Sequence, residues 1–181
     1  MSAHPLDRPV WSALTTGWGA IALGDERALR LAPAYGPFAA TARPSGAAAG
    51  EPDFEVALLG EEDAPQMRAL AELTRPGPFS MRTHRLGGFI GVKQDGRLVA
   101  MAGERMRMDG FAEVSGVCTH PDHRGRGYAG GLMRLVARRM MARGETPFLH
   151  TYESNATAIA LYRTLGFEAR RTVVLTVLKR S

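Results

Sequence analysis

The sequence predicts a single α/β domain with a mixed, mostly antiparallel central sheet and helices on both faces. Its 181 residues are enough for one domain with a buried core, and 45% apolar and 23% charged residues are ordinary for a globular protein. Strand-like apolar runs alternate with segments of helical spacing. Three consecutive strand-like runs are separated by tight turns at Asp95-Gly96 and Met108–Gly110, and such turns connect antiparallel neighbours.

Residues 1–50 differ in character from the rest of the chain. A short helix is predicted at Pro9–Leu14 and a strand at Trp18–Leu23. The stretch Ala39–Pro52 is rich in Ala, Gly, Pro and Ser, which is typical of a mobile linker. We therefore divide the chain into an N-terminal extension of unknown role, residues 1–50, and a main domain, residues 51–181.

The main domain is predicted to begin with a strand and a helix. Phe54–Leu59 has the apolar character of a strand, Asp63 is a plausible helix cap, and Pro65 suits a first helical turn. Pro76–Pro78 ends this helix. The antiparallel strands that follow are Gly88–Lys93, Arg97–Arg107 and Phe111–Thr119.

The last part of the chain predicts alternating helices and strands. In the helix Gly127–Arg143, one apolar stripe includes Leu132 and Val136, and Gly144 ends the helix in the left-handed conformation that glycine favours. The remaining elements are a strand at Thr146–Tyr152, a helix at Asn155–Leu165 and a strand at Thr172–Leu178.

Composition and charge exclude several classes of protein. The single cysteine cannot form an internal disulfide or a thiolate metal site, and His120, His123 and His150 lack metal-binding spacing, so no metal is predicted. The sequence has neither a signal peptide nor an 18-residue apolar stretch, so we expect a cytoplasmic protein without a membrane partner. The net charge of +5 raises the question of nucleic acid, but the arginines are dispersed, which favours an anionic cofactor and a solvated surface instead.

A glycine-rich segment, His123–Gly130, follows the apolar run Val114–Thr119 where a strand gives way to a helix. Glycines leave backbone amides uncovered there and arginines add positive charge, which suits a phosphate or pyrophosphate. The spacing also satisfies the dinucleotide fingerprint G-x-G-x-x-G, but the antiparallel approach and the lack of a suitably placed acidic residue argue against that interpretation. A helix start with glycines for packing is the alternative.

Asn155 and Tyr162 form a second constellation at the start of a later helix. They are seven residues apart, about two helical turns, so they share a face. Together an amide and a phenol could hold a polar ligand and donate a proton. The alternatives are a helix-capping asparagine and a tyrosine that reaches out of the core.

Together these motifs resemble the GNAT superfamily of acyl-CoA-dependent N-acyltransferases. Arg124-x-x-Gly127-x-Ala129 is similar to its pyrophosphate loop, and Asn155-x-x-Ala158-x-x-Leu161-Tyr162 followed by Gly166-Phe167 is similar to its downstream asparagine–tyrosine segment. The resemblance spans about residues 54–179. Within the superfamily, Val117–Pro121 and Pro147–His150 look most like the glycine N-acyltransferase-like branch.

The resemblance implies a role for each matching residue. Asn155 would contact the pantetheine arm of CoA or its phosphate end, and Tyr162 would protonate the departing CoA thiolate. The strand segment would pair with the pantetheine arm, and an amide there, that of Val117, would polarise the thioester carbonyl. Its residues are Val117, Cys118 and Thr119. The backbone amides of the loop would hold the CoA pyrophosphate, and its residues are Arg124, Gly125, Arg126, Gly127, Tyr128, Ala129 and Gly130.

A base for the amine is expected on the strand that leads to the loop. Glu113 is our candidate, and a salt-bridged or solvent-facing strand glutamate without a catalytic role is the alternative. Glu104 on the neighbouring strand is the fallback, and a water chain without a single base stays open. Strand alternation places Glu113 and Val117 on one face and Cys118 on the other. We therefore interpret Cys118 as a packing residue and not as a nucleophile.

The sequence thus predicts an N-acetyltransferase that moves the acetyl group of acetyl-CoA to a primary amine by direct attack in a ternary complex. The amine, on a small molecule or a peptide, is not identified, and a homodimer is left open. Two rival interpretations are a non-catalytic acyl-CoA-binding regulatory domain of the same fold and a module that binds nucleotide or nucleic acid through the basic loop.

Overall fold

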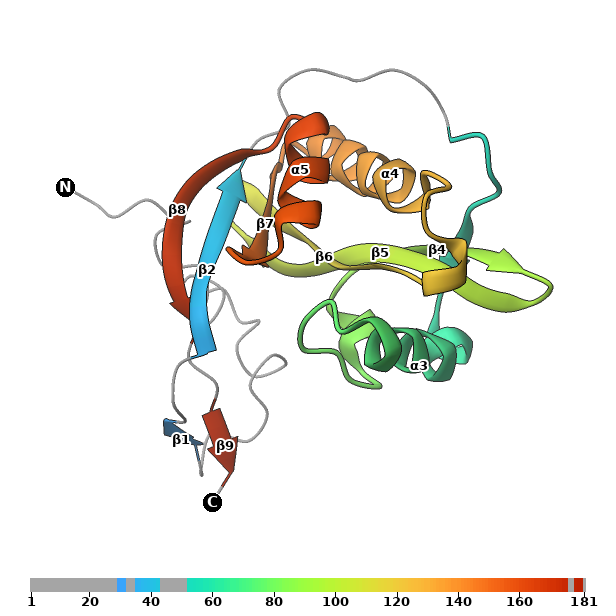
Figure 1. The fold of residues 1–181 in the computed structure, drawn as a ribbon, viewed down its shortest axis with the longest axis horizontal. Coiled ribbons are helices and arrows are strands. Elements are labelled where there is room, and N and C mark those ends of the chain that lie inside the picture. The colour runs from blue at the N-terminus through green and yellow to red at the C-terminus, as the bar shows by residue number, and fades with distance from the viewer. Residues whose placement is uncertain (1–28, 32–34, 43–51, 176–177, 181) are drawn as a thin grey trace.

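A computed structural model describes residues 29–31, 35–42, 52–175 and 178–180 of the chain, and its centre is a seven-stranded sheet. Helix α3 covers one face of the sheet, and α4 and α5 lie on the other (Figure 1). In spatial order the strands are β3 Ala57–Leu59, β4 Phe89–Gln94, β5 Arg97–Met108, β6 Phe111–Thr119, β7 Thr146–Tyr152, β2 Tyr35–Ala42 and β8 Glu168–Leu175. The predicted fold class is confirmed.

The remaining elements are helices, single turns and a small separate ribbon. The α-helices are α3 Ala64–Thr74, α4 Tyr128–Ala142 and α5 Ala156–Thr164. The 3-10 turns are η3 Glu61–Asp63, η4 Thr83–Leu86 and η5 Pro121–His123. The ribbon pairs β1 Leu29–Leu31 with β9 Leu178–Arg180. Within the described residues, no helix is both long and apolar enough to cross a bilayer.

Tight turns produce the antiparallel half of the sheet, as the sequence predicts. Asp95 and Gly96 both have positive φ, 49° and 75°, and they join β4 to β5 in a two-residue hairpin. Gly110, with φ of 73°, lies in the turn between β5 and β6. Both turns therefore join antiparallel strands, as their sequences predict.

Two apolar cores lie on opposite faces of this sheet. One contains Leu132 and Val136 of α4, which pack on Val114 of β6. The other contains Met67 and Leu70 of α3. Both helices thus bury the apolar stripes that their sequence spacing indicates.

The N-terminal extension contributes a strand to the main sheet. Strand β2 lies between β7 and β8 and pairs antiparallel with both. The prediction of a linker from Ala39 is therefore wrong for residues 39–42. Pairing with the edges of β7 and β8 outweighs the low strand propensity of these residues. The elements predicted at Pro9–Leu14 and Trp18–Leu23 lie outside the described residues. β3 begins three residues later than the predicted strand Phe54–Leu59, and β8 begins four residues before Thr172.

A β-bulge at Gly116 overturns the expected alternation along β6. Met101 pairs with Cys118 and Gly103 with Ser115, so three steps along β6 match two along β5. Gly116 has φ of 62°, which favours glycine. Beyond it, Val117 packs against the α4 core and Cys118 joins the α3 core. Val117 is therefore on the face opposite Glu113, and the predicted shared face of these two residues is wrong.

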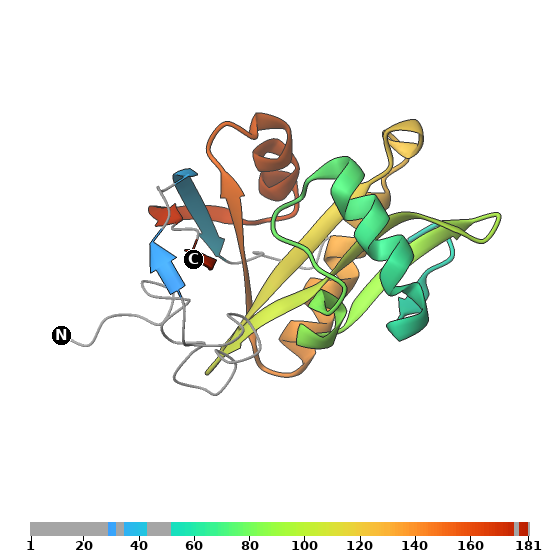
Figure 2. The same cartoon turned by 90° about the horizontal axis from the view of Figure 1, so that it is seen from below.

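The sheet opens between its two parallel strands. β6 and β7 pair at Phe111–Thr146, Ala112–Pro147 and Glu113–Phe148, all at the beginning of the two strands. Past these pairs they diverge, and Figure 2 shows a V between β6 (yellow) and β7 (orange). We call this opening the fork. It places the end of β6, with the glycine-rich loop that follows, apart from the end of β7.

Candidate functional site

The glycine-rich loop forms an open, positively charged approach to α4. Gly125 and Gly127 both have φ of 76°, and a Cβ built on either residue would meet no atom within 4 Å. Gly127 is the N-cap of α4 and provides no side-chain cap, so the first-turn amides of the helix face outward without a side-chain acceptor. Arg124 and Arg126 are exposed beside them. This loop fits a pyrophosphate group, which would accept hydrogen bonds from these amides.

Helix α5 lies against the first turn of α4. A Cβ built on Gly130 would be 3.5 Å from Cδ1 of Leu161, the residue before Tyr162. The side-chain oxygen of Asn155 accepts a hydrogen bond from the amide of Ala158 at 3.2 Å and caps α5. If Asn155 also contacts a ligand, the donor would therefore be its side-chain amide nitrogen. The two predicted motifs are brought together, although more than twenty residues separate them in the sequence.

Tyr162 is a partly buried residue of α5 that packs against the core beneath α4. Burial raises its pKa, and a hydrogen bond with the Thr151 side chain partly offsets this. The hydroxyl is thus protonated at neutral pH, the state that a proton donor requires. Its ring packs edge-on against Phe167, with centroids 6.3 Å apart. This packing fits both a tyrosine that reaches out of the core and a tyrosine that donates a proton.

Glu113 lies at the start of the fork, in a buried ion-pair cluster. Its carboxylate accepts hydrogen bonds from Nε and Nη2 of Arg105 at 2.9 and 2.8 Å. Nδ1 of His150 lies 2.8 Å from the same carboxylate. Burial raises the pKa of Glu113, but the Arg105 charge and the His150 and Arg105 hydrogen bonds outweigh it and lower the pKa to about 2.

Glu104, the fallback base, belongs to a different cluster. Its carboxylate binds Nη2 of Arg107 at 3.1 Å and Nη2 of Arg143 at 2.7 Å. Arg143 lies directly after α4, at the end of the helix away from the glycine-rich loop. This cluster ties β5 to the connection before β7 and has the character of a structural ion-pair network.

Cys118 lies under α3. Its side chain is buried, and burial raises the pKa of the thiol to about 11. A thiolate is the reactive form of cysteine, so this environment makes Cys118 inert. The interpretation of Cys118 as a packing residue agrees with this environment, although the residue faces α3 and not the face that alternation predicts.

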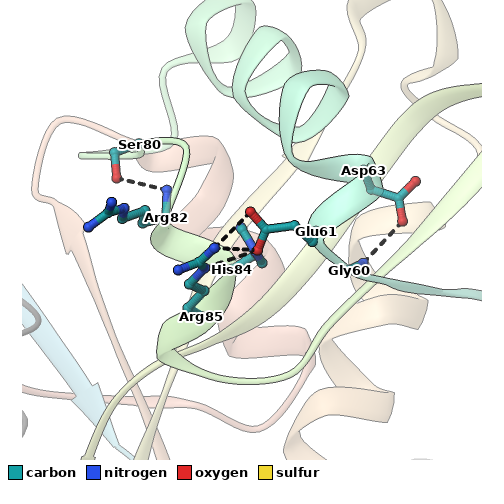
Figure 3. Close-up of polar contacts among 7 residues, drawn as sticks. All are labelled: Gly60, Glu61, Asp63, Ser80, Arg82, His84 and Arg85. Carbon is teal, nitrogen blue, oxygen red and sulfur yellow. Dashed lines mark hydrogen bonds and ion pairs between the residues drawn. The ribbon is translucent and has the colours of Figure 1, made fainter.

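The segment after α3 passes over the same face of the sheet as Cys118. Phe79 packs edge-on against Phe89, with centroids 5.7 Å apart, and its ring lies 3.3 Å from a Cβ built on Gly116. Figure 3 shows how this segment is anchored: Glu61 binds Nε2 of His84 at 3.0 Å and Nη2 of Arg85 at 2.8 Å. The segment is therefore held next to the bulge, on the side opposite α4.

Sequence reasoning identified Glu113 but missed its two partners. Arg105 is one of many arginines, and His150 was noted only as the end of the Pro147–His150 segment and as a histidine without metal-binding spacing. The signal that unites them is the parallel register that pairs Glu113 with Phe148, two residues before His150. No cluster of three or more potential metal ligands occurs among the described residues.

Comparisons with known proteins agree with the fold. The FR47-like protein family matches residues 89–175. A solved protein from Novosphingobium aromaticivorans that is named as an acetyltransferase of the GNAT family is 39% identical, with a TM-score of 0.78, over 99% of this chain and 100% of that one. The ribosomal-protein-S18-alanine N-acetyltransferase of Escherichia coli shares the fold at 22% identity and a TM-score of 0.58, over 68% of this chain and 92% of that one.

A shorter match lies among curated proteins. A Yersinia pestis protein named as an acetyltransferase is 38% identical over 58 residues, 31% of this chain, and the match spans only 40% of that protein. The fold and the relatives together define the class of this chain as an acetyltransferase. It belongs to the GNAT family, as the full-length similarity to the Novosphingobium protein shows.

Proposed function

We propose that this protein transfers the acetyl group of acetyl-CoA to a primary amine by direct attack in a ternary complex. The observation that carries the proposal is the fork between β6 and β7, which has the open glycine-rich loop at the end of one strand and Tyr162 packed beside the other. A donor that lies along β6 would reach from the loop to the beginning of the fork. Membership of the GNAT family supports the same reaction.

The donor is proposed to bind through backbone groups. The amides of residues 124–130 would hold the pyrophosphate, with the positive end of the α4 dipole adding to them. Backbone groups of Val117, Cys118 and Thr119 would pair with the pantetheine arm, beyond the last β6–β7 pair. The bulge at Gly116 reorients the chain just before Val117, so the Val117 amide is our candidate for polarising the thioester carbonyl.

Proton transfers are proposed to occur on opposite faces of the sheet. Tyr162, on the α4 and α5 face, would protonate the CoA thiolate as it leaves. Glu113, with its side chain on the α3 face, is among the residues that we propose remove the proton of the amine. An amine must lose a proton to form an amide. Catalysis therefore requires a proton donor and a proton acceptor on either side of one thioester.

The first test is thiol release from acetyl-CoA with a panel of primary amines that includes glycine, spermidine and an alanine-terminated peptide. We expect release with at least one amine. The Tyr162→Phe variant should lower kcat roughly 10- to 1000-fold, in line with the loss of a general acid, while acetyl-CoA affinity by calorimetry stays within about twofold. Full activity of this variant would contradict the donor role.

The rival function, a non-catalytic acyl-CoA-binding domain, predicts calorimetric binding without thiol release for every amine. Glycine in the panel also tests the glycine N-acyltransferase-like branch, which stays a prediction, as does a cytoplasmic location. Calorimetry with NAD and with a short duplex, which we expect not to bind, tests the nucleotide and nucleic-acid alternative.

A further inference from the structure

The buried position of Glu113 limits what its carboxylate can do. The side chain is 1% exposed, and Arg105 and His150 contact both of its oxygens. An amine could approach it only by displacing one of these partners. The lowered pKa of Glu113, about 2, also makes it a weak acceptor at neutral pH. Glu113 is therefore suited to hold a neighbouring group, not to receive the proton itself.

His150 is the neighbour that the fork brings into place. It lies on β7 two residues past Phe148, the last residue of β7 that pairs with β6, so it stands where the strands begin to part. Its side chain is 9% exposed, against 1% for Glu113. Phe148 packs edge-on against the imidazole, with centroids 5.5 Å apart. The imidazole is thus held by a charge on one side and a ring on another.

The hydrogen bond to Glu113 fixes the tautomer of this imidazole. An ionised carboxylate can only accept hydrogen bonds, so Nδ1 of His150 carries the proton and donates it to Glu113. The basic lone pair is then on Nε2. Arg105 donates two hydrogen bonds to that carboxylate and keeps it ionised.

We propose that His150 accepts the proton of the amine, and that Glu113 and Arg105 are positioning residues that orient and charge-balance its imidazole. This inference rests on the proposed acetyl transfer. It moves the proton-accepting role from the Glu113 carboxylate to the ring that this carboxylate holds. The assignment also agrees with the faces of β7: His150 lies on the side of Glu113, whereas Leu149, next to it in the strand, packs into the α4 core.

Acetyl transfer by this arrangement moves two protons. The amine nitrogen uses its lone pair to form the N–C bond, and the C–S bond breaks with its electron pair going to sulfur. The thiolate takes the Tyr162 hydroxyl proton, and the surplus proton on nitrogen passes to Nε2 of His150. That transfer can be direct or run through a hydroxyl or a water that contacts Nε2. Solvent then restores both side chains.

The test compares the wild type with His150→Gln, Glu113→Gln and Glu104→Gln. The amine is the panel member that the wild type acetylates fastest. We expect His150→Gln to lower kcat/KM for this amine roughly 100-fold or more and to remove the fall in rate at acid pH, while KM for acetyl-CoA stays within about twofold. Glu113→Gln should lower kcat/KM by a smaller factor. Glu104→Gln, which removes a buried carboxylate from its two partly exposed arginine partners, should lower the melting temperature but leave the shape of the pH profile unchanged.

A spectroscopic measurement decides the arrangement without any acceptor. Nitrogen-15 NMR of the histidine rings at neutral pH should show His150 protonated on Nδ1, and this preference should weaken in Glu113→Gln. A ring protonated on Nε2 alone, or a His150→Gln variant with the wild-type rate and pH profile, overturns the proposal. If the wild type acetylates no amine, the proposed function fails, and the NMR result still decides the role of Glu113.

Discussion

Gly116 and Phe89 are packed so closely that only a glycine fits between the bulge and the ring. A Cβ built on Gly116 would lie 2.8 Å from Cε1 of Phe89, and the φ of 62° at Gly116 already disfavours a side chain. The bulge and the aromatic core beneath it therefore depend on each other. Because Val117 follows directly, this contact also fixes the amide that we propose to polarise the thioester.

The Gly116→Ala variant should lose both stability and activity. Left-handed strain costs about 1–2 kcal/mol, and overpacking against Phe89 adds roughly 1–3 kcal/mol to the loss of free energy of unfolding. The control is Gly110→Ala, where φ is 73° but a Cβ would meet nothing within 4 Å. Urea denaturation should show the larger loss for Gly116→Ala, and only this variant should lower kcat. Equal losses of stability in the two variants would mean that the Phe89 ring moves aside without an energetic cost.

The donor loop offers a second matched pair, at the two ends of α4. Gly127 and Gly144 both have φ of 76°, and a Cβ on either residue would meet no atom within 4 Å. Alanine at either position should cost about 1–2 kcal/mol of stability. Only Gly127→Ala places a methyl group over the loop, so calorimetry should show its Kd for acetyl-CoA raised at least tenfold. Equal affinity in the two variants would contradict the assignment of the pyrophosphate to this loop.

Local signals in the sequence predicted most of the elements in the main domain. The Asp95-Gly96 turn, the left-handed Gly144 and the apolar stripe of α4 each depend on residues a few positions apart, and all three are confirmed. Short-range chemistry decides such features, so one sequence is enough to identify them.

Long-range pairing determined what the sequence could not predict. The residues of β2 have few strand formers, and their inclusion depends on the open edges of β7 and β8. The bulge at Gly116 shifts every later residue of β6 to the other face, which simple alternation cannot anticipate. The partnership of Glu113 with His150 depends on the register of two parallel strands, a property of the assembled sheet.

The Glu113 cluster predicts acid sensitivity. The folded-state pKa of about 2 lies below the ordinary value of 4.5, so the ionised carboxylate contributes stability above pH 4.5 that is lost as the pH falls toward 2. Glu113→Gln should lower the free energy of unfolding at neutral pH by roughly 3–5 kcal/mol, because Arg105 loses its buried partner, and should flatten the dependence in this window. Denaturant titrations at several pH values measure both effects. A variant with the same slope as the wild type would show that other carboxylates dominate.

Strand β2 predicts that the extension is needed for folding. It pairs with both β7 and β8, and the β7 residues that it pairs with include His150 and Thr151. Deletion of residues 1–50 should therefore leave two strand edges without their partner and give a protein that aggregates or unfolds without cooperativity. Circular dichroism melts and gel filtration check this. A cooperative melt at the wild-type temperature would instead support a separable domain that begins near residue 51.

The reactivity of the Cys118 thiol separates direct acetyl transfer from transfer through an acetyl-enzyme intermediate. Burial raises the pKa of its thiol from 9.0 to about 11, so at pH 8 the thiolate fraction is about 100-fold lower than for an ordinary cysteine. Iodoacetamide should therefore label the native protein at least 100-fold more slowly than the same protein unfolded in guanidinium. Intact-mass measurement after incubation with acetyl-CoA should show no acetyl adduct on this residue. Rapid labelling together with an acetylated Cys118 would replace direct attack in a ternary complex with a two-step mechanism, because the acetyl group would then reach the amine from the enzyme and not from CoA.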